Sequence, residues 1–333
     1  MEGLKEAGKE GGNMIVNQYK IKSGMNFDET PIWLYILWKI GFTCNKCFPN
    51  EKYALYEKWI LKKYRQLILA KETDCYLKKY YDKRSLPMFT SIEIEVINRC
   101  NGECPFCPVN RYADIRKLKK MDEKLFFKII NELGEMNYTG RLALHSNNEP
   151  LLDSRIIDFA KYAREKVPNA YIYMYTNGTL LTLDKFKIII SLLDKIIIDN
   201  YNDELEMHKN VQDIHNYCKQ NKNIDRKVEI HLRKIHEVLS TRGGQSPNNN
   251  RRKTIKMSCI LPYKQMVVRP DGKISLCCND AYGKNTMADL NRMTLKEAWY
   301  SAQYERARKL LRSGRTQIRL CKYCDTMPNP KTY

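Results

Sequence analysis

From residue 91 onward, two kinds of segment alternate along the chain. Short apolar runs have the alternation of strands, and longer segments have apolar positions at helical spacing. The candidate strands are Ile92–Ile97, Arg141–His145, Ala170–Tyr175, Lys195–Asp199 and Val228–Leu232. The candidate helices include Glu123–Leu133, Ser154–Lys166 and Leu183–Leu193. Repeated strand–helix units predict an α/β fold, with a parallel sheet covered by helices and a ligand site at the carboxyl ends of the strands.

The two ends of the chain follow other patterns. Residues 1–24 are rich in Gly and Lys and are predicted to be disordered or loosely attached. Apolar positions at helical spacing predict helix over residues 30–85. Near the C-terminus, Pro270-Asp271-Gly272 predicts the turn of a β-hairpin, and a helix follows over Thr294–Leu311. We therefore expect a helical extension at residues 1–90, the α/β domain at 91–250 and a small domain at 251–333.

Composition narrows the class of protein. The longest apolar run, Pro31–Phe42, is too short to span a membrane and contains a lysine, and the polar first residues predict no signal peptide. Seven of the twelve cysteines fall into cluster-like groups, which favours a reducing cytoplasm. The net charge of +20 is scattered without an RNA-binding motif, so we expect no nucleic-acid partner. The same charge suits a phosphorylated substrate.

The stretch CNGECPFC, which directly follows the first candidate strand, carries the strongest chemical signal. It places Cys100, Cys104 and Cys107 in a C-x3-C-x2-C spacing. Three thiolates can hold three irons of a [4Fe–4S] cube and leave the fourth iron open to a small molecule. The alternatives are a zinc knuckle or buried thiols, but zinc sites usually have a fourth Cys or His close by in paired spacing.

A second set of cysteines lies in the C-terminal segment. Adjacent residues of a strand point in opposite directions, so only one of Cys277 and Cys278 can readily join the remaining cysteines, which are Cys259, Cys321 and Cys324. Four thiolates make a closed site that suits electron transfer or a structural role. Structural zinc in the same ligands is the alternative. Cys44, Cys47 and Cys75 are predicted to be packing residues or incidental thiols.

The cysteine loop resembles that of the radical S-adenosylmethionine (SAM) superfamily. The resemblance implies a partial (β/α)6 barrel in which the three cysteines hold a [4Fe–4S] cluster and SAM binds the open iron, giving a 5′-deoxyadenosyl radical. It also implies that Phe106 packs against the adenine. Asn148 and Glu149 stand where the family has a Gly-Gly-Glu-like stretch at the methionine amine, and Thr176 and Asn177 are placed for the ribose hydroxyls.

The C-terminal segment resembles the SPASM domain in its shortened form, the twitch domain, which holds one auxiliary [4Fe–4S] cluster. The family pattern implies four ligands, namely Cys259, Cys277, Cys321 and Cys324. The resemblance extends to the aminocyclitol dehydrogenases of butirosin biosynthesis, in which the counterpart of Arg242 approaches the substrate. The implied function is oxidation of a carbinol carbon in a sugar- or aminocyclitol-like substrate, with the electron passing to the auxiliary cluster. A flavodoxin- or ferredoxin-type protein is the implied reductant.

Cys278 leaves a second function open. An aromatic residue stands at this position in those dehydrogenases, whereas a free thiol facing the barrel can donate a hydrogen atom to a substrate radical. The alternative function is therefore a radical SAM epimerase with Cys278 as the hydrogen-atom donor. A peptide-modifying maturase and a non-catalytic iron–sulfur or nucleic-acid-binding protein are further alternatives.

Overall fold

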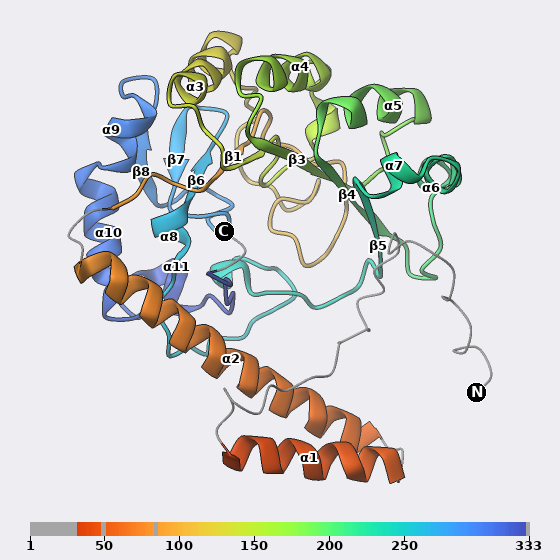
Figure 1. Ribbon diagram of the computed structural model, residues 1–333, viewed down its shortest axis with the longest axis vertical. Coiled ribbons are helices and arrows are strands. Elements are labelled where there is room, and N and C mark those ends of the chain that lie inside the picture. The colour runs from red at the N-terminus through yellow and green to blue at the C-terminus, as the bar shows by residue number, and fades with distance from the viewer. Residues whose placement is uncertain (1–31, 48–50, 83–85, 331–333) are drawn as a thin grey trace.

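The computed structural model describes residues 32–47, 51–82 and 86–330. Figure 1 shows a twisted sheet with helices along its outer side and a long helical hairpin that projects from one end of the molecule. The predicted disorder of residues 1–24 falls outside the described residues.

One eight-stranded sheet runs through the molecule in the order β5-β4-β3-β2-β1-β6-β7-β8. Its strands are β1 (Ser91–Ile94), β2 (Arg141–Ala143), β3 (Tyr171–Thr176), β4 (Lys195–Tyr201), β5 (Val228–Arg233), β6 (Gln265–Val268), β7 (Lys273–Ser275) and β8 (Thr286–Asp289). The strands β1 to β6 pair in parallel, while β7 and β8 pair antiparallel. All five predicted strands form, with ends that differ by up to three residues, and the α/β fold class is confirmed.

The sixth parallel strand lies at an unexpected place in the sheet. β6 pairs with β1, in the register Ser91↔Gln265, and does not continue the sheet beyond β5. The predicted hairpin is present, because β6 and β7 pair across a turn in which Gly272 adopts a positive φ of 80°. The C-terminal segment therefore extends the sheet of the α/β domain from its β1 edge, and this brings the loop after β7 to the site described below.

The helices of the α/β domain follow the predicted pattern. They are α3 (Glu123–Glu135), α4 (Ile156–Lys166), α5 (Leu183–Leu192), α6 (Lys209–Gln220) and α7 (Lys222–Asp225), with short 3-10 turns η2 (Pro150–Leu152) and η3 (Arg242–Gly244). The side chain of Asp122 caps α3 by accepting from the Lys124 backbone N–H, and Thr182 caps α5 in the same way. These caps set the helix starts within two residues of the predicted ones.

The single helix predicted over Thr294–Leu311 is wrong. Two helices form, α9 (Leu295–Trp299) and α10 (Ala302–Arg312), beside the shorter helices α8 (Leu261–Lys264) and α11 (Arg319–Lys322). Ser301 breaks the run because its side chain accepts from the Tyr304 backbone N–H and so starts a new helix. The apolar periodicity continues across the break, which is why the pattern alone indicated one helix.

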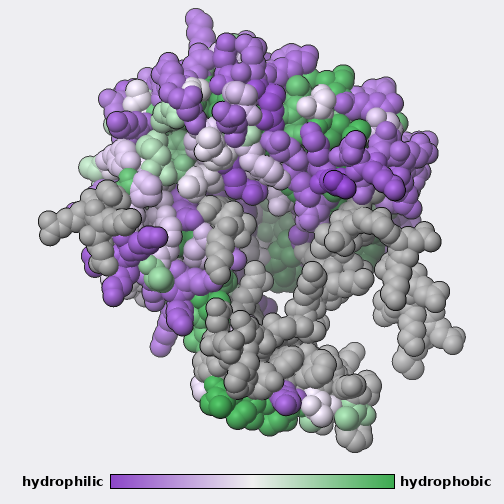
Figure 2. Space-filling view, in the orientation of Figure 1, coloured by the Kyte–Doolittle hydropathy of each residue, from purple (hydrophilic) through white to green (hydrophobic). Residues whose placement is uncertain are grey.

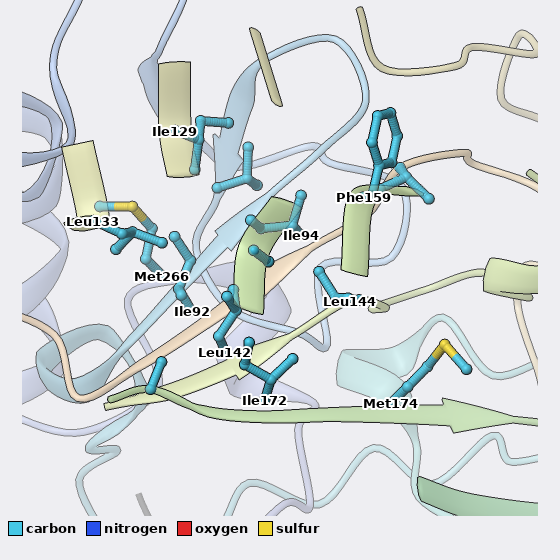
Figure 3. Close-up of a cluster of buried hydrophobic side chains, with 14 of the residues drawn as sticks. Ile92, Ile94, Ile129, Leu133, Leu142, Leu144, Phe159, Ile172, Met174 and Met266 are labelled. Carbon is cyan, nitrogen blue, oxygen red and sulfur yellow. The ribbon is translucent and has the colours of Figure 1, made fainter. Parts of the chain in front are cut away.

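The two faces of the sheet differ in chemistry. Ile92, Leu142 and Ile172 lie side by side in register and point toward the helices, where they are fully buried (Figure 3). Phe126 and Phe159, from α3 and α4, stack there with ring centroids 4.1 Å apart. The neighbouring register row on the opposite face reads Glu93, Ala143 and Tyr173. A carboxylate and a phenol on this inner face mark it as the side that receives a ligand.

The predicted N-terminal helical segment forms a hairpin of α1 (Ile32–Cys47) and α2 (Glu51–Asp82), with residues 48–50 and 83–85 outside the described ranges. The far end of α2 packs against the body, where Tyr80 contacts Tyr263 and the Lys264 ammonium lies over the Tyr76 ring. Figure 2 shows an apolar patch at the projecting end, to which α1 contributes Ile32, Trp33, Ile36 and Ile40. Within the described residues, no helix has the length and apolar character needed to cross a bilayer.

Candidate active site

A cavity of about 490 Å³ opens at the carboxyl ends of the parallel strands. The loops after β1, β2 and β3 line it, as the sequence predicts. The predicted residues that line this cavity are Cys100, Cys104, Phe106, Cys107, Asn148, Glu149, Thr176, Asn177, Arg242 and Cys278. Residues from several separate segments therefore meet in one place.

The cysteine loop is held by hydrogen bonds of its own backbone. The Cys107 N–H donates to the Cys104 carbonyl at 3.0 Å, and the Asn110 side-chain amide donates to the carbonyls of both Cys104 and Cys107, at 3.0 and 3.1 Å. The Gly102 N–H donates to the Cys100 sulfur at 3.3 Å. A Cβ on Gly102 would lie only 3.3 Å from that same sulfur, so the loop needs a glycine to wrap this closely around the thiol.

The thiols of this loop suit a positively charged cluster. Burial, together with the neighbouring thiols, raises the pKa of Cys100 and of Cys104 to about 12. Without a metal these groups therefore stay protonated at neutral pH, and a metal cluster would supply the positive charge that makes them thiolates. The Asn148 side-chain amide nitrogen, on the cavity wall, is buried without a hydrogen-bond partner. The donor set and this unpartnered amide fit a cluster with a polar ligand beside it.

Glu149 ties the loop after β2 to the end of β3. One carboxylate oxygen accepts from the Thr176 hydroxyl at 2.8 Å and from the Leu151 N–H at 3.1 Å. The other oxygen accepts from the Asn177 backbone N–H at 2.8 Å. Glu149 is only 1% exposed, and burial raises its pKa. The side chain thus positions the two residues that are predicted to hold the ribose.

Asn177 joins the β3 loop to the cysteine loop. Its amide nitrogen donates to the Asn101 side-chain oxygen at 2.9 Å, and its own oxygen accepts from the Thr179 hydroxyl at 2.7 Å. Across the cavity, the Phe106 ring packs against Tyr201 at the end of β4, with centroids 5.5 Å apart. The residues predicted to surround an adenosyl group are therefore fixed from both sides.

The inner end of the cavity carries a polar group that the sequence pattern did not reveal. The Glu93 carboxylate accepts from the Ser146 hydroxyl and from the Gln265 side-chain amide, each at 2.7 Å. Burial raises the pKa of Glu93 to about 7, although the Ser146 hydrogen bond and the charge of Arg242 act to lower it. The sequence does show a charged residue, Glu93, within the apolar strand β1. Because β1 was interpreted as a strand of the core, Glu93 was not considered as a site residue.

Arg242 and Cys278 complete this inner end. Arg242 lies in η3 with a positive φ of 48° and donates to the Asn147 side-chain oxygen. The Asn147 amide donates in turn to the Cys278 carbonyl at 3.1 Å, and the Cys278 N–H donates to the Gln265 side chain at 3.3 Å. Burial is the main cause that raises the pKa of Cys278, with Glu93 adding to it, so the thiol keeps its proton. Glu93, Arg242 and Cys278 therefore all line the cavity and lie close enough to influence one another electrostatically.

Further polar groups on the wall were also missed. Asp199 on β4 lies 2.8 Å from the His231 ring nitrogen Nδ1 and accepts from Arg233 at 3.0 Å. His145 is buried, and burial lowers its pKa to about 3, so its ring is neutral. Asp199, His145 and Arg233 all stand at the carboxyl ends of predicted strands, and that position was the signal that could have found them.

The four cysteines predicted to hold the auxiliary cluster are buried beyond the cavity. Cys259, Cys277, Cys321 and Cys324 are each 6–8% exposed. Burial raises the pKa of Cys277 well above its usual value, and the nearby Cys278, Cys321, Cys324 and Cys259 raise it further. Cys278 instead lines the cavity, so the two adjacent cysteines point to different sites. Their assignment as ligands stays a prediction.

The cysteines do not gather as they would around one ion. Four thiolates on a tetrahedral zinc lie about 3.8 Å apart, from a Zn–S distance of about 2.3 Å. Among residues 32–47, 51–82 and 86–330, no group of three or more His, Cys, Asp or Glu side chains is close enough to hold a single metal ion.

The comparisons with known proteins agree with this geometry. Residues 94–239 match the radical SAM superfamily, and residues 259–325 match the SPASM iron–sulfur cluster-binding domain. The chain therefore carries a radical SAM domain followed by a C-terminal SPASM domain. Proteins with these two domains bind SAM and two [4Fe–4S] clusters. One cluster binds SAM, and the other is auxiliary.

A particular relative is the S-adenosyl-L-methionine-dependent 2-deoxy-scyllo-inosamine dehydrogenase of Niallia circulans. It is 28% identical over 242 residues, covering 72% of this chain and 94% of the relative. The crystal structure of BtrN in complex with AdoMet and 2-DOIA superposes with a TM-score of 0.63 at 28% identity, over 73% of this chain and 95% of that chain. A structure of anSMEcpe with bound AdoMet, at 16% identity and a TM-score of 0.50 over 72% of this chain and 86% of that one, shares the fold.

Proposed function

We propose that this enzyme oxidises a secondary alcohol of a small sugar- or aminocyclitol-like substrate to a ketone. The carbinol loses a hydrogen atom from carbon, a proton from oxygen and one further electron. When bound, SAM and its cluster supply the radical that takes the hydrogen atom, and the auxiliary cluster accepts the electron. The observation that carries the proposal is a cavity with three thiols on one wall and Glu93, Arg242 and Cys278 at its inner end, in a chain related to an aminocyclitol dehydrogenase.

Glu93 is suited to take the hydroxyl proton. A general base works best with a pKa near the operating pH, and burial brings the pKa of Glu93 to about 7. Hydrogen bonds from Ser146 and Gln265 fix both carboxylate oxygens, so the group is already oriented. Arg242 contributes a nearby positive charge that can hydrogen-bond a substrate hydroxyl.

The wall suits a small polyhydroxylated substrate with an amino group. Glu93 and Asp199 offer carboxylates, and Tyr173, Tyr175 and Tyr201 offer apolar ring faces with hydroxyl ends. The named relative acts on 2-deoxy-scyllo-inosamine, an aminocyclitol. Arg141, Arg233 and Arg242 also reach the cavity, and a phosphate group on the substrate would suit these.

A second candidate function, epimerisation, rests on Cys278. Its thiol lines the cavity beside Glu93 and Arg242, and burial keeps it protonated, which is the form that can give a hydrogen atom to a carbon radical. An epimerase would return hydrogen to the opposite face of the same carbon and would leave the oxidation state of the product unchanged.

Solvent deuterium separates the two functions. The reaction is run in D2O with wild type and with Cys278→Ala, and the product is analysed by mass spectrometry. The dehydrogenase function predicts a ketone, whose former carbinol carbon carries no hydrogen, and it predicts that the Cys278→Ala variant still forms this ketone. An alcohol product that carries deuterium with wild type and loses it with the variant would establish the epimerase instead.

The role of Glu93 is tested by its pH profile. Because the base must be deprotonated and the pKa of Glu93 is about 7, kcat/KM of the reconstituted enzyme should rise with pH through about 7 and then level off. Glu93→Gln should lower kcat about 10²- to 10⁴-fold and abolish this rise, while SAM binding stays intact. A variant with the wild-type pH profile would exclude Glu93 as the base.

We also propose the compartment and the reductant of this enzyme. None of the twelve cysteines, all of which lie in the described ranges, forms a disulfide, and this favours a reducing cytoplasm. A flavodoxin- or ferredoxin-type protein would deliver the electron that starts each turnover. Among the residues that the structure describes, no winged-helix element supports a peptide maturase, and the sequence offers no RNA-binding motif, so we propose neither of these remaining alternatives.

A further inference from the structure

Arg315, just after α10, is a buried cation whose hydrogen bonds all go to the main chain. Its side chain is 1% exposed. The guanidinium donates to the carbonyls of Met257 at 3.1 Å, Ser258 at 3.4 Å, Cys324 at 3.3 Å and Thr326 at 2.8 Å. Five N–H groups in a fixed planar fork suit this arrangement, which the single ammonium of a lysine cannot reproduce in full.

These four carbonyls flank two of the predicted auxiliary ligands. Met257 and Ser258 directly precede Cys259, while Cys324 is itself a predicted ligand and Thr326 follows two residues later. The guanidinium therefore fastens two chain segments, far apart in sequence, to each other at the auxiliary site.

The charge of Arg315 has no carboxylate to balance it. Within the described ranges, no Asp or Glu oxygen lies within ion-pair distance of the guanidinium, although a buried charge is normally paired. Asp325, which stands between Cys324 and Thr326 in the chain, directs its carboxylate to the Thr241 N–H and hydroxyl. The auxiliary cysteines are the other nearby groups that can become anionic. The guanidinium bonds the carbonyl of Cys324 itself and that of Ser258, the residue before Cys259, so its charge lies beside these ligands.

We propose that Arg315 is the internal counter-cation of the auxiliary cluster, a positioning residue that holds the Cys259 and Cys324 segments together and raises the reduction potential of the cluster. A cluster ligated by four thiolates carries net negative charge, and reduction adds one more. A fixed positive charge in a water-excluded site favours the reduced form, since burial, charge and hydrogen bonding set the potential of such clusters. This inference rests on the predicted auxiliary ligands but not on the identity of the substrate.

The test is a redox titration followed by electron paramagnetic resonance. The full chain is reconstituted with Cys100, Cys104 and Cys107 each changed to Ala, so that only the auxiliary cluster contributes. Arg315→Met removes the charge, Arg315→Lys keeps it, and Arg319→Gln removes an exposed arginine two residues from Cys321 as the matched control. Water screens an exposed charge, so the control should leave the potential unchanged.

We expect Arg315→Met to disfavour reduction at least tenfold, which is a shift of about 59 mV to more negative potential for a one-electron couple. Arg315→Lys should stay close to the unsubstituted protein. If Arg315→Met fails to hold iron while Arg315→Lys holds it, and the melting temperatures of the metal-free proteins are alike, the charge is needed to keep the four thiolates and the proposal stands. An unchanged potential in Arg315→Met, or equal loss of fold in both variants, would overturn it.

Discussion

At the scale of the residue, several buried polar groups of this site hold other residues of the site in place by hydrogen bonds. Glu149 is predicted to bind the cofactor, and its carboxylate accepts hydrogen bonds from the Thr176 hydroxyl and from the Asn177 and Leu151 N–H groups. Such a carboxylate can matter as much as a direct contact, because the loop it holds cannot keep its position alone. Whether Glu149 also contacts SAM stays a prediction.

Glu149→Gln is expected to weaken SAM binding about tenfold or more. A glutamine replaces one of the two acceptor oxygens with an NH2 group, so either the Asn177 N–H or the pair formed by the Thr176 hydroxyl and the Leu151 N–H loses its acceptor. A lost hydrogen bond to a charged group costs about 1.5–3 kcal/mol. Equilibrium dialysis of SAM against the reconstituted protein measures this.

Glu103→Gln is the matched control for that measurement. Glu103 lies in the same cysteine loop, but its side chain is 53% exposed and bonds only Arg111 and Tyr112 at the surface. Its loss should leave the SAM affinity unchanged, because exposed ion pairs contribute little. Equal affinities for wild type and Glu149→Gln would show that the β3 loop does not depend on this carboxylate.

At the scale of the element, the turn after β3 shows how closely the rim of the sheet is packed. Gly178 has a positive φ of 78°, and a Cβ at this position would lie 2.7 Å from Ile198 Cγ2 and 2.8 Å from Val211 Cγ2. The turn therefore depends on glycine twice, for its backbone conformation and for its close approach to β4 and α6.

Gly178→Ala should lower the free energy of unfolding more than Gly314→Ala does, by about 1–3 kcal/mol. Gly314 also has a positive φ, of 113°, but nothing lies within 4 Å of the place that its Cβ would take. The pair therefore separates the cost of overpacking from the cost of the backbone conformation. Thermal or denaturant unfolding of the metal-free proteins gives both values, and equal losses would refute the packing argument.

The sequence predicted the elements better than their arrangement. Apolar periodicity placed β1 to β5 and α3 to α5, because each of them buries one regular face. It could not place β6, since the partner of a strand depends on the sheet edge it meets, and Gln265–Val268 pairs with β1, which lies far away in the sequence. It also missed the break between α9 and α10, where the local hydrogen bond of Ser301 overrides a continuous apolar pattern.

The sequence likewise predicted only those site residues whose role is evident from a local pattern. Thiols in a tight spacing identify their own chemistry, so Cys100, Cys104 and Cys107 were found from the sequence. Glu93 and Arg315 were not, because each derives its role from burial and from distant partners that no local pattern reveals.

At the scale of the whole molecule, the continuous sheet joins the two cysteine sites. Since β6 pairs with β1, the loop after β7 delivers Cys278 to the cavity while the adjacent Cys277 remains with the buried auxiliary set. The inner end of the cavity and the auxiliary site are therefore connected through a single peptide unit. The proposed oxidation sends an electron from the substrate to the auxiliary site. A short connection between the cavity and that site suits this step.

The central claim is that the Cys100–Cys107 loop holds a cluster with one iron left for SAM. The most direct measurement is the iron content and the yield of 5′-deoxyadenosine when anaerobically reconstituted protein is reduced in the presence of SAM. Wild type should bind about eight irons and cleave SAM, whereas the variant with Cys100, Cys104 and Cys107 changed to Ala should keep about four irons and cleave none. Zinc in the loop, or cleavage that survives in the variant, would contradict the account.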